Sequence, residues 1–210
     1  MKKINIYQVT TLLLGLAFII LAYTKTSSEK KAMETSKKEA VIENIHSRKS
    51  VRKYVAGRPV SKDDLLTLVK AGMAAPSAKN VQPWAFVALS ERSTLDKLAD
   101  ELAYAKMLKA APSAIVVCGR LDRDAGGELW QLDCSAAAQN ILLAAEAMGL
   151  GAVWTAAYPY KDRADAVVRA LNLPPHIIPL CVIPVGYPDG AETPKDKWKE
   201  ENLKWEKWGE

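Results

Sequence analysis

The stretch SAIVVCG at residues 113–119 decides the fold, and Pro112 stands directly before it. It contains no charged residue and is bounded by Pro and Gly, a pattern that predicts a short strand in the centre of a sheet. A second apolar run, IIPLCVIPVGYP at residues 177–188, predicts the last strand of the chain. We therefore expect a fold whose centre is a sheet that contains residues 113–119.

Helix and strand patterns alternate around these runs. Ser61 followed by Asp64 predicts a helix start of the capping-box kind. Residues 128–149 predict the longest helix, which is alanine-rich and closes at Gly149. Its small residues would let another helix approach closely, either within the core or across a dimer interface. The other expected elements are helices at 41–47, 93–110 and 162–171 and strands at 84–90 and 151–157. Few strands with much helix form an α+β pattern.

Charge and cysteine content exclude two classes of function. The 210 residues carry a net charge of +5, and the first 40 residues, with seven Lys and three Glu, hold most of that excess. The rest of the chain lacks the positive charge that neutralising phosphates requires, so no nucleic-acid-binding face is expected. Three cysteines without metal-ligand spacing and only two histidines argue against a metal site. The cysteines are expected to be small buried hydrophobic residues: Cys118, Cys134 and Cys181.

The first 23 residues predict a targeting segment. Lys2 and Lys3 precede an uncharged run that ends at Tyr23, and about 20 apolar residues can just span a bilayer as a helix. Since neither an A-x-A cleavage site nor a Cys follows, an uncleaved signal-anchor is favoured over a cleaved signal peptide. The expected localisation is membrane-anchored or exported to the cell envelope or periplasm, with a cytoplasm-facing body left open. Residues 24–40 predict a polar tether, and residues 41–210 the folded domain, with 189–210 as a Trp-rich extension.

Three polar segments could hold a ligand. The segment SRKSVRK at 47–53 carries four cations and two hydroxyls, which suits phosphate oxygens, although a solvated basic turn is the alternative. The segment AAPSAKNVQPW at 74–84 offers amide side chains to a planar ligand, or is simply a capped loop. The segment TPKDK at 193–197 delivers two lysines that could meet the same phosphate, or is a charged tail.

Taken together, in this order and spacing, these segments resemble the nitroreductase family of FMN-dependent oxidoreductases over residues 41–208. The first resembles the family's R-x-S-x-R phosphate motif, and the second its P-S-x-x-N-x-Q-P-W loop. The stretch GLGAVWTAAYP at 149–159 is similar to the strand that lines the flavin ring, and PKDKW at 194–198 to the late P-K-x-R segment, with Lys197 in place of Arg. The resemblance implies a three-layer fold, with a mostly antiparallel sheet flanked by helices, and an intertwined homodimer whose partner is wrapped by residues 189–210.

The resemblance also implies which residues bind FMN. The phosphate and ribityl chain would lie on the first segment, with two late lysines closing on the phosphate. The Pro-Ser-Asn loop would approach the ring, usually from the other subunit. Many members carry a Glu-Gly pair where this chain has Ala156-Ala157, so backbone N–H groups are expected to donate there. The implied cofactor-binding residues are Arg48, Lys49, Ser50, Arg52, Pro76, Ser77, Asn80, Trp154, Thr155, Ala156, Lys195 and Lys197.

The implied activity is transfer of hydride from NAD(P)H through FMN to a nitroaromatic, a quinone or a similar electron-poor acceptor, by a ping-pong mechanism. Since the cofactor carries the chemistry, no catalytic acid–base pair is expected among the side chains. Three alternatives stay open at this point. They are a membrane-tethered flavin electron relay without enzymatic turnover, a flavin-dependent dehalogenase of the same fold, and a member that has lost FMN.

Overall fold

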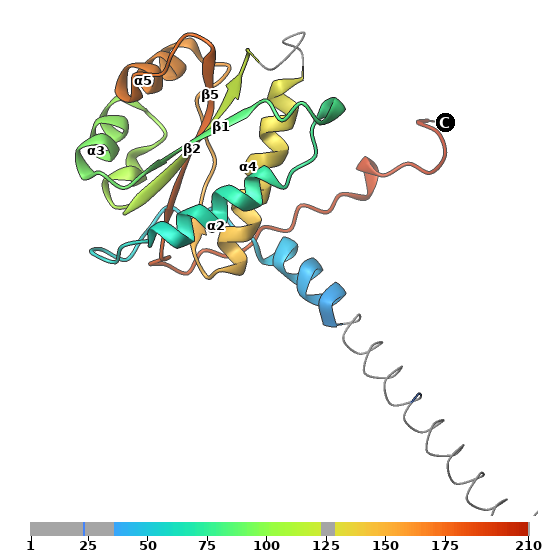
Figure 1. Cartoon of the computed structure of the whole chain (residues 1–210). Coiled ribbons are helices and arrows are strands. Elements are labelled where there is room, and N and C mark those ends of the chain that lie inside the picture. The colour runs from blue at the N-terminus through green and yellow to red at the C-terminus, as the bar shows by residue number, and fades with distance from the viewer. Residues whose placement is uncertain (1–22, 24–35, 123–128, 210) are drawn as a thin grey trace, which may run out of the picture. The chain divides into compact units, whose positions relative to one another are not determined.

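The structure is a computed structural model that describes residues 23, 36–122 and 129–209 (Figure 1). The chain divides into two units, residues 1–45 and 46–210. Residues 36–47 are helical, which confirms the helix expected at 41–47. All further elements belong to the second unit.

One antiparallel sheet forms the centre of the second unit. The strand order is β1 (Trp84–Leu89), β2 (Ser113–Arg120), β5 (Ile177–Gly186) and β3 (Gly151–Ala152), and β4 (Thr155–Ala156) also pairs with β5. The predicted central strand at 113–119 is confirmed, because β2 lies between two partners and its first seven residues are all buried. The predicted last strand is β5, which is the other inner strand.

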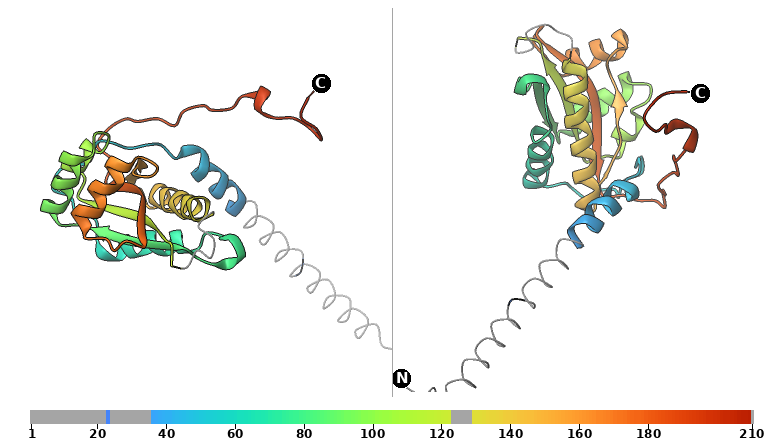
Figure 2. Two further views of the ribbon diagram at one scale, coloured as in Figure 1. Left: turned by 90° about the horizontal axis from the view of Figure 1, so that it is seen from above. Right: turned by 90° about the vertical axis from the view of Figure 1, so that its right-hand side faces the viewer.

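Side-chain alternation along β2 divides the core into two layers. Ile115 and Val117 pack with α2 (Lys62–Met73) and α4 (Trp130–Ala147) on one face. Val116 packs on the other face with α3 (Arg92–Glu101), the 3₁₀ turn η2 (Lys106–Lys109) and α5 (Lys161–Leu171). Figure 2 shows the resulting helix–sheet–helix arrangement. The predicted α+β fold with a flanked antiparallel sheet is therefore confirmed.

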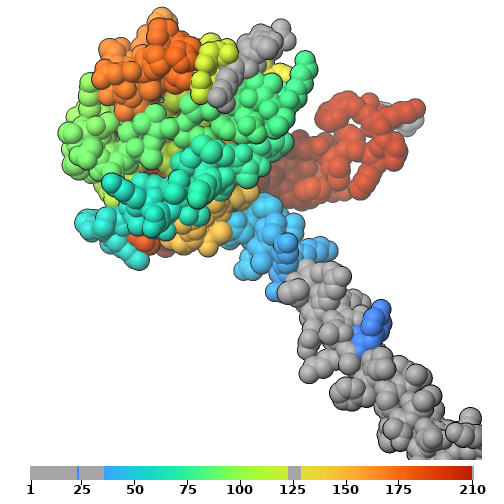
Figure 3. All heavy atoms as spheres, in the orientation of Figure 1, coloured from blue at the N-terminus to red at the C-terminus, as the bar shows by residue number. Residues whose placement is uncertain are grey.

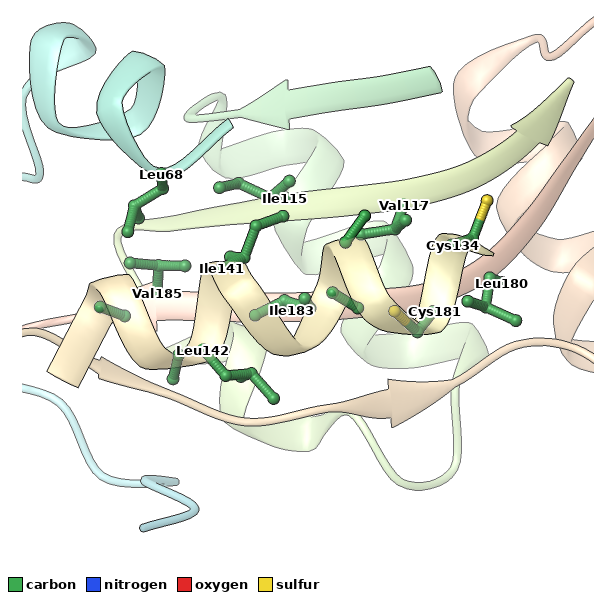
Figure 4. Packing of buried hydrophobic residues seen from close by; sticks show 14 of the residues in the cluster. Leu68, Ile115, Val117, Cys134, Ile141, Leu142, Leu180, Cys181, Ile183 and Val185 are labelled. Atoms are coloured by element: carbon green, nitrogen blue, oxygen red, sulfur yellow. The ribbon is translucent and has the colours of Figure 1, made fainter. Parts of the chain in front are cut away.

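Helix α4 is the longest helix of the part that the structure describes, as its sequence predicted. Its buried side chains, among them Ile141, lie against the inner strands, where Ile115 and Ile183 meet them (Figure 4). The helix ends before Gly149, which has a φ of +68°, so the glycine supplies the left-handed turn that leads into β3. The predicted start of α2 is also confirmed, because the Ser61 hydroxyl accepts the Asp64 N–H at 3.0 Å.

Two predicted elements are wrong in extent. The expected helix at 93–110 is α3 followed by η2, since the Lys106 ammonium donates to the carbonyls of Ala99 (2.8 Å) and Asp100 (3.2 Å) and thereby caps α3. The expected strand at 151–157 is interrupted between β3 and β4, each of which pairs separately with β5. Apolar spacing could not predict either break, because both depend on contacts outside the segment.

The membrane prediction requires correction. Within residues 23, 36–122 and 129–209, no helix is both long and apolar enough to cross a bilayer. The predicted targeting segment at 1–23 lies outside the described residues except for Tyr23, and so does most of the predicted tether at 24–40. The described residues therefore give the signal-peptide and membrane assignments no support, and the domain boundaries stay predictions.

Gly119 on β2 tests the packing between the sheet and α4. A Cβ at this position would lie 2.3 Å from Cε3 of Trp130, whose ring is buried and cannot swing away. We expect Gly119→Ala to lower the free energy of unfolding by about 1–3 kcal/mol and the melting temperature by roughly 2–4 °C per kcal/mol. The control is Gly190→Ala, where a Cβ meets only the flexible Glu192 carboxylate. Equal melting curves for Gly119→Ala and the unchanged protein would contradict this packing.

Candidate functional site

A basic pocket of about 540 Å³ lies in the second unit. It is formed by two segments that are far apart in the sequence, residues 48–52 and residues 191–197. A single carboxylate, Glu192, lies among the cations, and its Oε2 atom is buried without a hydrogen-bond partner. The cations that line the pocket are Arg48, Lys49, Arg52, Lys195 and Lys197. The two predicted phosphate segments are thus brought together, and their net positive charge suits a polyanion.

The fold holds the 48–52 segment through its inward side. Val51 is buried, and its N–H donates to the Ala152 carbonyl of β3 at 3.1 Å. The Tyr54 hydroxyl donates to the carbonyls of Val51 (2.9 Å) and Pro184 (3.3 Å), and burial raises the pKa of Tyr54 far above its ordinary value. Arg48, Ser50 and Arg52 line the pocket together with Lys49, whereas Val51 is buried in the protein.

Among the described residues that line the pocket, Lys49 differs from the other cations because it forms an ion pair with a carboxylate. Its Nζ lies 2.9 Å from Oε1 of Glu146 near the end of α4. The side chains are 26% and 14% exposed, respectively, so solvent screens this pair less than it would screen a surface pair. Lys49 therefore contributes less net charge to the pocket than Arg48 or Arg52 does.

The loop at 76–82 is held by side-chain oxygens. Ser77 Oγ accepts the Gln82 N–H at 2.9 Å, and Asp133 Oδ1 on α4 accepts the Ala78 N–H at 3.1 Å. Three residues of this loop that are not glycine have positive φ: Lys79 (52°), Asn80 (57°) and Gln82 (54°). Left-handed backbone costs about 1–2 kcal/mol for an ordinary residue, so these anchors maintain a strained loop.

The 76–82 loop does not reach the basic pocket of the same copy. None of its residues is among the described residues that line that pocket. Its anchor Asp133 and the pocket's anchor Glu146 lie about 20 Å apart along α4, at 1.5 Å per residue. Pro76, Ser77 and Asn80 are therefore separate from Arg48 and Lys195 within one chain.

The predicted segment at 149–159 lies beside the pocket. Trp154 and the short strand β4 follow β3, which carries the hydrogen bond to Val51. Trp154 and Ala156 are half-buried. The Thr155 hydroxyl donates to the Val182 carbonyl at 2.6 Å, so its hydrogen is used within the sheet and cannot be donated to a ligand.

Sequence reasoning missed three residues that hold the site together. They are Tyr54, Asp133 and Glu146, whose partners lie 3 to 130 residues away. The one signal in the sequence was that Asp133 and Glu146 are the two charged residues of an alanine-rich helix. An acidic residue in such a helix either faces solvent or has a partner, and the sequence alone does not distinguish the two.

The cysteines are not part of the site. All three are free and buried, as predicted. Burial raises the pKa of the Cys118 thiol to about 12 and that of Cys181 well above its ordinary value. Across the described residues, no cluster of His, Cys, Asp and Glu could hold a metal ion. The site therefore offers cations and hydrogen-bond donors rather than a nucleophile.

Comparison with known proteins agrees with this geometry. The sequence model of the nitroreductase family matches residues 45–105 and 99–187. A putative NADH dehydrogenase/NAD(P)H nitroreductase of Methanothermobacter thermautotrophicus is 42% identical over 170 residues, which are 80% of this chain and 87% of that protein. A crystal structure with the same description from Bacteroides thetaiotaomicron is 53% identical, with a TM-score of 0.77 over 80% of this chain and 98% of the other. A putative nitroreductase in complex with FMN from Desulfovibrio desulfuricans is 28% identical, with a TM-score of 0.70 over 80% and 98% of the two chains.

Thiol reactivity tests the buried state of the cysteines. At about pH 8 we expect no reaction of the native protein with a water-soluble disulfide reagent, and full reaction after unfolding in guanidinium. The unfolded chain ionises Cys118 near pH 9, whereas the folded protein keeps the proton to about pH 12. The free energy of unfolding should therefore fall as pH rises above about 9. Rapid labelling of a thiol in the native protein would contradict the described core.

Proposed function

Because the chain belongs to the nitroreductase family, we propose that it is an FMN-dependent oxidoreductase that takes its electrons from NAD(P)H. The observation that carries the proposal is the basic pocket, in which residues 48–52 and 193–197 converge beside β3 and β4. Bound FMN supplies the redox chemistry, since it can accept a hydride and pass electrons to a second substrate. The protein supplies binding, orientation and electrostatics.

The pocket residues fit a sugar-alcohol phosphate. Arg48 and Arg52 present planar forks for phosphate oxygens, and Lys195 and Lys197 add two point charges. The unpartnered Oε2 of Glu192 is an acceptor, so a hydroxyl-bearing chain next to the phosphate would satisfy it. This combination of donors and one acceptor matches a ribityl phosphate.

The ring would lie against the segment at 154–156. The hydroxyl of Thr155 is bonded inside the sheet, so this residue would contribute backbone rather than side-chain contacts. The partly exposed faces of Trp154 and Ala156 are available to a planar group. Pro76, Ser77 and Asn80 would contact the ring from a second copy, because they do not reach the pocket of their own chain.

The acceptor would be an electron-poor compound such as a nitroaromatic or a quinone, which would enter after the nicotinamide has left. The chain's role in both half-reactions is electrostatic. Its fixed cations and backbone dipoles favour an anionic cofactor without reorganisation. No side chain needs to exchange a proton in this scheme.

A homodimer would complete the site. The C-terminal extension after β5 is drawn in red in Figure 3. It carries Trp198, Trp205 and Trp208, which are 69%, 80% and 81% exposed. Tryptophans in such number seldom remain in water on a single chain, because each can bury a large apolar surface. A second copy of this chain would cover them.

The visible spectrum of the purified protein tests the cofactor and the donor. We expect a flavin spectrum that bleaches when NADH or NADPH is added without oxygen. The variant Arg48→Ala/Lys195→Ala should bind FMN at least about 100-fold more weakly, since each charged hydrogen bond contributes about 1.5–3 kcal/mol. The control is Lys70→Ala/Lys97→Ala, which removes two exposed charges outside the pocket. Full flavin retention by the first variant would refute the pocket, and a spectrum that does not bleach would refute the donor.

Mixed dimers test whether two copies share each site. One chain carries Arg48→Ala with one affinity tag, and the other carries Asn80→Ala with a second tag. If Asn80 acts on the neighbour's cofactor, one site of the mixed dimer carries both substitutions and the other carries neither. We therefore expect one tightly bound FMN per mixed dimer, at a concentration where neither single-variant dimer binds. No tight site at all would mean that both residues act within one copy.

A further inference from the structure

Both candidate cofactor segments are attached to the same helix by carboxylates. Asp133 lies in the first turn of α4 and holds the 76–82 loop. Glu146 lies in the last turn and holds Lys49 of the 48–52 segment. Neither carboxylate was expected to bind the cofactor, and Asp133 does not line the basic pocket. Because both carboxylates lie on one helix, they fix the positions of the two segments relative to the same element.

Asp133 is only 8% exposed, which is unusual for a carboxylate. Removing an ionised group from water costs several kcal/mol unless hydrogen bonds compensate. Its contact with the loop is the Ala78 N–H, 3.1 Å from Oδ1. The next residues, Lys79 and Asn80, have left-handed backbone, so the anchor lies directly before the strained part of the loop.

Glu146 fixes the other segment in a comparable way. Val51 is buried in the protein, whereas Arg48, Lys49, Ser50 and Arg52 line the pocket. Lys49 reaches Glu146 at 2.9 Å, and the Val51 N–H reaches Ala152 at 3.1 Å. The ammonium of Lys49 is therefore a tether for the segment, although Lys49 also lines the pocket.

We propose that Asp133 and Glu146 are positioning residues that fix the two cofactor segments about 20 Å apart on α4, and that Lys49 acts through Glu146 rather than on the phosphate. The inference rests on the proposed function, because the cofactor is what the two segments would hold. The buried middle of α4, with Ile141 and Leu142 on the sheet, keeps this spacing constant (Figure 4). The arrangement presets both segments before the cofactor binds.

A charge swap tests the role of Lys49. Lys49→Glu and Glu146→Lys should each weaken FMN binding about 10-fold or more, because each leaves like charges in contact. The double variant Lys49→Glu/Glu146→Lys restores an ion pair and should recover binding to within about 3-fold. FMN dissociation constants from fluorescence titration are the measurement. If Lys49 were a phosphate ligand, the double variant would stay as weak as Lys49→Glu, which would overturn the proposal.

Hydrogen exchange tests the role of Asp133. Asp133→Ala should speed amide exchange in the peptide 74–84 without affecting the peptide 113–120 of β2, and should weaken FMN binding about 10-fold. Asp133→Asn keeps an oxygen acceptor and should recover most of both. The control is Ser135→Ala, whose hydroxyl donates only within α4, to the Gln131 carbonyl at 2.6 Å. If Asp133→Ala does not fold, Asp133→Glu, which displaces the carboxylate, takes its place.

The outcomes separate this inference from the function on which it rests. An unchanged protein that binds no FMN would refute the proposed function. An unchanged protein that binds FMN, with Asp133→Ala and Glu146→Lys binding equally well, would overturn only the positioning role. Faster exchange in both peptides would show that Asp133 supports the whole fold, and this outcome would also overturn it.

Discussion

The burial of α4 against β2 and β5 is the interaction on which the rest of the structure depends. Ile141 and the apolar residues around it fill the space above the two inner strands. A glycine permits this close contact, since a Cβ at Gly119 of β2 would lie 2.3 Å from Cε3 of Trp130 on α4. Because the helix is fixed on the sheet, Asp133 and Glu146 hold the 76–82 loop and the 48–52 segment at fixed positions. The same apolar contact thus stabilises the core and sets the geometry of the polar site.

Local sequence patterns predicted most of the fold but little of what supports the site. The uncharged run at 113–119, the Ser61 cap and the alanine-rich helix each carry their information within a few residues, and all three are confirmed. The ion pair between Lys49 and Glu146 joins residues 97 positions apart, and no periodicity encodes such a contact. The same limitation explains the early end of α3, which depends on Lys106. The family motifs predict which residues meet a ligand, but they do not predict which other residues hold these in place.

Electrostatics in this protein is local. Apart from its first 40 residues, the chain is almost neutral, yet five cations converge in one pocket with a single carboxylate. Folding creates this concentration of charge by joining a segment near the start of the domain to one after the last strand. Net charge would not have identified it. The ion pair with Glu146 neutralises Lys49, whereas Arg48 and Arg52 form no such pair with any described residue and can bind an anion.

The burial of the three thiols has a consequence for durability. A flavin that meets oxygen generates peroxide, and peroxide attacks the thiolate form of cysteine. In the folded protein the cysteines are buried away from water, and burial raises the pKa of the Cys118 thiol, so the thiolate does not form. Among the described residues, the sulfur most open to damage is then the thioether of Met73, which is 51% exposed. Methionine sulfoxide can be reduced enzymatically. Oxidation of Met73 would therefore be reversible and would occur outside the basic pocket.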